Sequence, residues 1–158
     1  MAKLSMAIMI LLQSIYNREK SVLDISELNI WAVIVAWLIN MFVGAFWYSP
    51  GGFAKQWTRY TGNDIMKIPQ QEATQILGFV ALSALVQAVT LALIIAATNA
   101  MTALDGVSVG LLLWFGLVSA TTVGVTLYQR LSWKFLWLNS AYFLVVMSIN
   151  SVILAIWR

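Results

Sequence analysis

The chain lacks cysteine and histidine, and it has few charges. It has no residue of either type, and only 9% of its 158 residues are charged. Without them there is no disulfide, no thiolate or imidazole metal ligand, no cysteine nucleophile and no histidine base. An average soluble domain has roughly a quarter charged residues. These absences argue against most enzyme classes and against a soluble fold.

Apolar residues instead make up 61% of the chain. This fraction is typical of an integral membrane protein. The net charge of +3 is small and spread over loops, which favours contact with anionic lipid headgroups over binding of nucleic acid. We predict an N-terminal segment and linker in residues 1–28 and a single transmembrane domain in residues 29–158.

Four apolar runs without a charged residue are long enough to cross a bilayer, which takes about 20 helical residues. A charge at the bilayer centre would cost about 3 kcal/mol on insertion scales. Short connections between the later runs make neighbouring helices antiparallel. The sequence therefore predicts an all-α integral membrane protein with transmembrane helices at residues 30–48, 76–98, 107–128 and 135–157.

The apolar run at residues 4–16 is too short to span and lacks a signal-peptide cleavage pattern. We predict an interfacial or partly buried helix there. The alternatives are an uncleaved signal-like segment and a mis-assigned start codon. Either Ser26 or Asn29 is expected to cap the first transmembrane helix by accepting a bond from a free backbone N–H.

The stretch GAFWYSPGGFAKQW, residues 44–57, marks the end of the first span. Pro50 has no N–H with which to continue a helix, and Gly51 and Gly52 permit the positive φ of a tight turn. A short amphipathic helix at residues 52–61 is predicted to follow. We interpret the stretch as a membrane exit with an interfacial anchor, and a ligand site is the alternative. The predicted anchor residues are Trp47, Tyr48, Phe53, Lys55, Trp57, Arg59 and Tyr60.

Two motifs stand out in this region, NIWAV at residues 29–33 and GAFWYSP at 44–50, followed by Phe53, Lys55 and Trp57. Together they resemble the signature of a family of small bacterial membrane proteins, domain of unknown function family 1761. The similarity is looser in the last helix, at Asn139 and Tyr142. The sequence departs from the family pattern after the proline. The resemblance implies four membrane helices and no known activity.

Basic residues on the loops predict the orientation. Lys55, Arg59 and Lys67 follow the first span, Arg130 and Lys134 follow the third, and the loop after the second has none. By the positive-inside rule, residues 49–75 and 129–134 are expected to face the cytoplasm.

Small residues repeat every fourth position in two of the spans, and such rows let helix backbones approach closely. We therefore expect helix packing at Ala36, Gly44, Gly116, Ala120 and Gly124. The third span also carries serines and threonines on another face. With two faces unsuited to lipid, it is predicted to lie centrally in the bundle.

Amides and hydroxyls inside the spans form a predicted polar seam. An amide facing hydrocarbon costs several kcal/mol, so these side chains should point into the bundle or into an oligomer contact. Asn40 and Gln87 lie at similar depth in antiparallel helices and are expected to be able to face one another. The seam consists of Asn40, Gln87, Thr122, Asn139 and Asn150.

Two functions from different classes fit these features. The first is a structural or accessory protein, acting as a homo-oligomer or as a subunit packed against a larger membrane complex. The alternative is a minimal transporter or channel for a neutral or weakly polar solute. No paired carboxylate, activated nucleophile, phosphate loop or metal cluster supports an enzyme, and no cofactor is expected. The bacterial inner membrane is the expected location.

Overall fold

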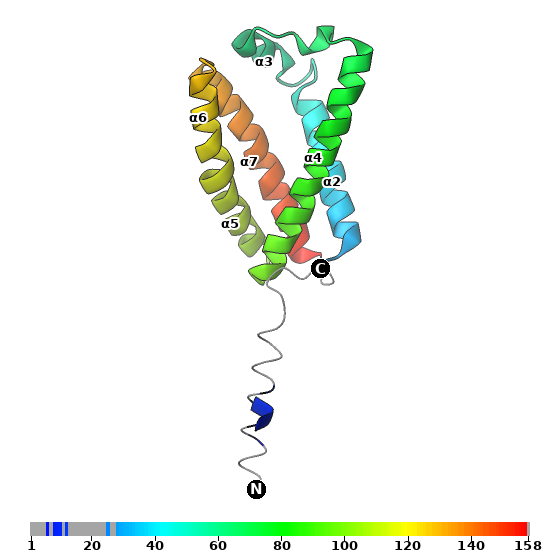
Figure 1. Cartoon of the computed structure of the whole chain (residues 1–158), viewed down its shortest axis with the longest axis vertical. Coiled ribbons are helices and arrows are strands. Elements are labelled where there is room, and N and C mark those ends of the chain that lie inside the picture. The colour runs from blue at the N-terminus through cyan, green and yellow to red at the C-terminus, as the bar shows by residue number, and fades with distance from the viewer. Residues whose placement is uncertain (1–5, 7, 11, 13–24, 26–27, 158) are drawn as a thin grey trace.

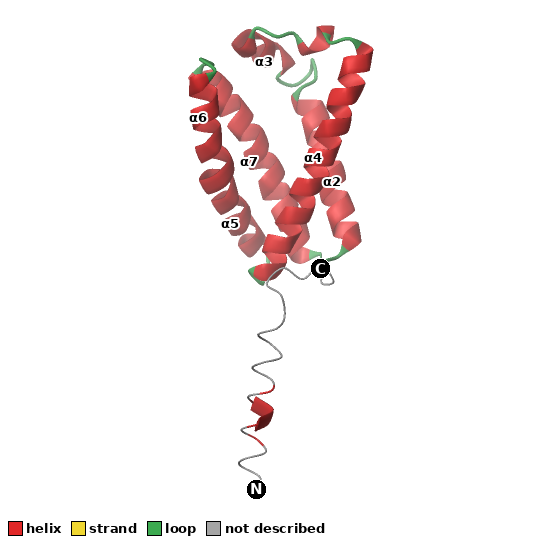
Figure 2. Ribbon diagram, viewed as in Figure 1, coloured by secondary structure: helices red, strands yellow, loops and turns green. Residues whose placement is uncertain are grey.

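The computed structural model describes residues 6, 8–10, 12, 25 and 28–157. Within this part of the chain all regular structure is helical, and the helices are joined by short loops (Figure 2). Most of the predicted interfacial segment 4–16 lies outside the described residues; the positions described within it, 6, 8–10 and 12, are helical. Four described helices are long and apolar enough to cross a membrane, which confirms the predicted fold class.

The spans are antiparallel neighbours that form two pairs, with α2 beside α4 and the third span beside α7 (Figure 1). The third span is one helix in three parts, because a π-helical segment, η3, interrupts it. The elements are α2 (Ile30–Trp47), α3 (Ala54–Thr61), the short 3₁₀ turn η2 (Ile65–Lys67), α4 (Gln70–Ala97), α5 (Ala103–Leu113), η3 (Trp114–Ser119), α6 (Ala120–Tyr128) and α7 (Trp133–Ile156).

Several boundaries differ from those predicted, because a helix need not end where the apolar run ends. The second span begins at Gln70 instead of residue 76, since α4 continues through polar turns after Pro69. The third begins at Ala103 instead of 107, because Thr102 and Asp105 cap each other's backbone N–H groups. The fourth begins at Trp133 instead of 135.

The caps at the other boundaries are local. Asn29 Oδ1 accepts bonds from the backbone N–H groups of Trp31 and Ala32, at 3.0 and 3.3 Å, so Asn29 is the cap of α2. The alternative cap, Ser26, lies outside the described residues. The first span ends at Trp47, and the interfacial helix begins at Ala54 instead of residue 52.

Helix α7 is the centre of the bundle. It packs against α2 and α4 on one side and against α5, η3 and α6 on the other, and it is the most buried of the four spans. The third span, which was predicted to lie centrally, is the least buried and has its main contacts with α7 alone. Its polar face does not require a central position, because the hydroxyls of Ser108 and Thr122 bond to carbonyl oxygens of their own helix.

Two glycines allow the third span to touch α7 closely. A Cβ added at Gly106 would lie 2.5 Å from the backbone oxygen of Ser151, and one added at Gly110 would collide with the Ser151 side chain. Backbones that approach this closely gain dispersion contacts, which replace the hydrophobic driving force that lipid does not supply. The contact therefore depends on the absence of side chains at both positions.

The row Gly116, Ala120 and Gly124 does not form such a contact within the chain. All three residues are exposed, and nothing lies within 4 Å of a Cβ added at Gly116 or Gly124. In an uninterrupted α-helix Gly124 would lie within about 40° of Gly110. The wider turns of η3 rotate the later residues, so the face that carries Gly124 turns away from α7.

These two environments predict opposite effects of the same substitution. Gly106→Ala should lower the free energy of unfolding in detergent by about 1–3 kcal/mol, because the new methyl group meets backbone. Gly124→Ala is the matched control, and it should leave stability unchanged or raise it by up to about 1 kcal/mol. Thermal unfolding of the two variants measures the difference. Equal stability of both would contradict the packing described here.

Candidate functional site

Polar side chains from three helices meet inside the bundle. Asn40 of α2 donates through Nδ2 to Gln87 Oε1 of α4 at 2.7 Å, and the Tyr142 hydroxyl of α7 donates to Asn40 Oδ1 at 2.7 Å. The Asn40 side chain is buried. We call these three residues the polar network. Each end of the Asn40 amide bonds to a different helix, so the network ties α2, α4 and α7 together.

Small residues on α2 make space for this contact. Gly44 lies one turn beyond Asn40, and a Cβ added there would lie 3.2 Å from the Tyr142 hydroxyl. Ala36, one turn before Asn40, is fully buried. Both predicted packing residues of the first span therefore lie on the face of α2 that faces the rest of the bundle.

Aromatic rings extend the site from the polar network to the end of α2. The Tyr48 and Tyr142 rings lie 5.6 Å apart, and the Tyr48 hydroxyl donates to Asn139 Oδ1 at 3.3 Å. The rings of Trp57 in α3 and Tyr48 are nearly perpendicular, with centroids 6.4 Å apart, and the rings of Trp47 and Phe53 have centroids 4.6 Å apart.

The predicted anchors thus divide into two groups. The rings of Trp47, Tyr48, Phe53 and Trp57 contact other rings of the chain, whereas Lys55 and Arg59 are exposed and Tyr60 is half-buried. The indole N–H of Trp47 is buried and has no hydrogen-bond partner among the described residues.

The turn after α2 is held by close backbone contact. A Cβ added at Gly52 would collide with the backbone oxygen of Phe46, and the Phe53 N–H donates to the Trp47 oxygen at 2.7 Å. Positive φ was expected at Gly51 and Gly52, but Gly62 is the one described glycine with positive φ. Gly52 is required because the chain folds back onto the last turn of α2, and its backbone conformation is ordinary.

The remaining seam residues lie outside the polar network. The Thr122 hydroxyl bonds to the Val118 carbonyl of its own helix. Asn150 is buried in α7, and its Oδ1 has no partner within the described chain. Of the five predicted seam residues, the structure joins Asn40 and Gln87 directly and brings Asn139 close to the network through Tyr48.

A second set of polar contacts on the opposite face of α7 was not predicted. The Trp114 indole donates to the Ser140 carbonyl at 2.8 Å, and the hydroxyls of Ser119 and Ser140 lie 2.7 Å apart. In a regular helix Ser119 would point about 180° away from Gly110, so periodicity gave no signal that both face α7. Tyr142 was also not predicted as a partner of Asn40, although it was noted one turn from Asn139.

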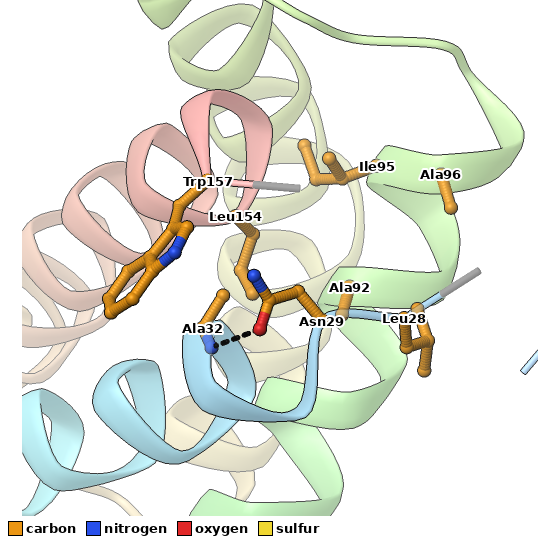
Figure 3. Close-up of a pocket in the computed structure, with 8 residues that line it drawn as sticks. All are labelled: Leu28, Asn29, Ala32, Ala92, Ile95, Ala96, Leu154 and Trp157. Atoms are coloured by element: carbon orange, nitrogen blue, oxygen red, sulfur yellow. Dashed lines mark hydrogen bonds between the residues drawn. The ribbon is translucent and has the colours of Figure 1, made fainter. Parts of the chain in front are cut away.

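A small cavity of about 20 Å³ lies at the other end of the bundle, between the start of α2 and the ends of α4 and α7 (Figure 3). This volume fits a single water molecule. The side chains of its wall that carry polar groups are Asn29, whose amide already caps α2, and Trp157, through its indole nitrogen (Figure 3). The lining residues are Leu28, Asn29, Ala32, Ala92, Ile95, Ala96, Leu154 and Trp157.

The polar network is neutral, since it contains two amides and a phenol. It supplies hydrogen-bond donors and acceptors and no formal charge. In the part of the chain that the structure describes, no group of three or more histidine, cysteine, aspartate or glutamate residues is arranged to hold a metal ion. The chemistry of this site is hydrogen bonding between helices.

Comparison with known protein families identifies the chain. The family model described as Protein of unknown function (DUF1761) matches residues 31–155. The chain belongs to this family. The match to DUF1761 runs from the first turn of α2 to the last turn of α7, so it includes all three residues of the polar network. No curated protein and no solved structure matches this DUF1761 chain.

The polar network predicts a specific role for one hydroxyl of the DUF1761 fold. Tyr142→Phe should lower the free energy of unfolding by about 1 kcal/mol, because Asn40 Oδ1 would stay buried without a donor. Tyr128→Phe, at a tyrosine that is 93% exposed at the end of α6, is the control and should have no effect. Unfolding in detergent is the measurement, and a Tyr142→Phe protein as stable as the control would contradict the bond's role.

Proposed function

We propose that this chain is a non-catalytic structural protein of the bacterial inner membrane. It assembles laterally, as a homo-oligomer or as a subunit of a larger membrane complex. The observation that carries this proposal is the direct bonding of Asn40 to Gln87 and Tyr142. A solute path needs polar atoms that are open to the solute, whereas both ends of this amide hold neighbouring helices together.

The outer surface of the bundle supports lateral assembly. The row Gly116, Ala120 and Gly124 is exposed, and small residues on an exposed transmembrane face permit close approach of another helix. Helix α4 is also exposed along most of one side, so this side is available to a protein neighbour.

Anionic lipid headgroups are the proposed partners at the membrane surface. Lys55 and Arg59 are exposed on α3, which lies at the end of the bundle where α2 finishes. The loops after the first and third spans lie at this same end (Figure 1). With their basic residues, they favour the cytoplasmic side of the membrane.

A double-mutant cycle tests the structural role of the polar network. Asn40→Leu and Gln87→Leu should each lower the free energy of unfolding by at least about 1 kcal/mol. Gln87→Leu leaves the Asn40 Nδ2 group without its acceptor, and Asn40→Leu leaves both Gln87 Oε1 and the Tyr142 hydroxyl without a partner. The double variant should recover part of that loss, since it removes both polar groups together. Thermal unfolding in one detergent measures all three variants.

The alternative function gives a different pattern in the same experiment. If the two amides line a solute path, each substitution leaves stability unchanged and abolishes the phenotype that the gene confers in cells. That combination would contradict the proposed structural function. Loss of stability with partial recovery in the double variant supports it.

The proposed orientation predicts how single cysteines react. Lys55→Cys should react with a membrane-impermeant thiol reagent only after cells are opened, because α3 faces the cytoplasm. Met101→Cys, in the exposed loop between α4 and α5, is the matched control and should react in intact cells. Reaction at position 55 in intact cells would reverse the orientation.

A further inference from the structure

A strip of polar side chains runs along an exposed flank of α4. Ser83, Gln87 and Thr90 are spaced by four and three residues, which places them on one helix face. Ser83 and Thr90 are exposed and Gln87 is partly exposed. The three residues, here called the α4 strip, lie near the middle of the apolar part of the helix, at the depth of the hydrocarbon.

The α4 strip has hydrogen-bonding capacity that the chain does not use. Gln87 accepts from Asn40 through Oε1, but its Nε2 donates to no other described residue. The hydroxyls of Ser83 and Thr90 also lack a partner within the described chain. In contrast, the threonine hydroxyls near both ends of α4 donate to carbonyl oxygens four residues earlier, at 2.9 Å.

Hydrocarbon cannot satisfy these groups, so a protein surface that donates and accepts hydrogen bonds is their natural cover. We propose that the α4 strip docks against the same strip of a second copy of this chain. This inference rests on the proposed function, because it names the partner in lateral assembly and the surface that binds it.

The chemistry of the strip fits a second copy as the partner. Two copies with the same orientation in a membrane are related by an axis along the membrane normal, so each residue meets its own counterpart at equal depth. An amide and a hydroxyl can each both donate and accept a hydrogen bond, and therefore each can pair with itself. Gln87 Nε2 of one copy then donates to the Gln87 amide of the other.

The exposed row Gly116, Ala120 and Gly124 on the third span has no unsatisfied hydroxyl beside it. The hydroxyls of Thr121 and Thr122 beside it already bond to the carbonyls of Leu117 and Val118. Those hydroxyls need no further partner, so that face permits close approach of another helix but does not require it. Unlike the exposed row of the third span, the α4 strip therefore carries polar groups that need a hydrogen-bond partner from another protein surface.

Cysteine cross-linking tests the contact directly, because the natural chain contains no cysteine. The test positions are Ser83→Cys and Thr90→Cys. The controls are Leu82→Cys, exposed at the same depth on another side of α4, and Gly124→Cys, exposed on α6. Each full-length variant is treated with an oxidant in native membranes, where a disulfide forms only if two Cα atoms approach within about 7 Å.

We expect a disulfide-linked dimer from both test positions and none from the two controls. A further variant, Ser83→Ala with Thr90→Val, removes the hydroxyls and leaves the Asn40–Gln87 bond intact. It should weaken dimerisation about threefold for each hydrogen bond lost. Its monomer should unfold at the same temperature as the natural protein.

Native mass measurement in mild detergent separates the two ways of failing. Assembly with a different protein, or a dimer that cross-links at position 124 and not at 83 or 90, would overturn this inference and leave the proposed function standing. A monomer without partners, in native membranes and in detergent, would overturn both.

Discussion

The bundle depends on how closely other helices approach α7. Lipid chains are as apolar as the side chains that face them, so burial of apolar surface does little to hold these helices together. On one side of α7, Tyr142 reaches across Gly44 to bond Asn40. On the other side, the backbone at Ser151 lies against Gly106. Each contact combines a missing side chain on one helix with a polar or backbone atom on the other, and together they place α7 between the two halves of the fold.

The π-helical segment η3 explains why all three parts of the third span contact α7. Before η3, the face towards α7 carries Gly110. Ser119, the last residue of η3, bonds to Ser140 of α7, and Thr126 follows in α6 as a buried residue. These two sets would lie on opposite faces of a regular helix, which turns by about 100° per residue. A π segment inserts extra backbone into the turn, so small residues can line the first half of the contact and hydroxyls the second.

The polar network and the aromatic cluster form one continuous structure between the middle of the bundle and the end of α2. Tyr48 and Tyr142 connect them, because their rings pack together while their hydroxyls bond to different asparagines. The return of the chain at Gly52 brings Phe53 onto Trp47, so the start of helix α3 is attached to the end of α2. The turn that looked like a simple membrane exit also positions the rings that close this end of the bundle.

The amino-acid sequence alone determined the helical membrane fold, the four spans and the shared depth of Asn40 and Gln87. Those features follow from local composition and from the fixed rise of a helix, which do not require knowledge of neighbours. Only the tertiary structure decided that α7 is central, that Gly106 and Gly110 make the close contact in place of Gly116 and Gly124, and that Tyr142 completes the polar network. Periodicity assumes one continuous helix, and η3 breaks that assumption. Several faces of a helix can be lined by small residues, and which of them is buried depends on the helix that packs against it. The sequence of one helix does not identify that partner.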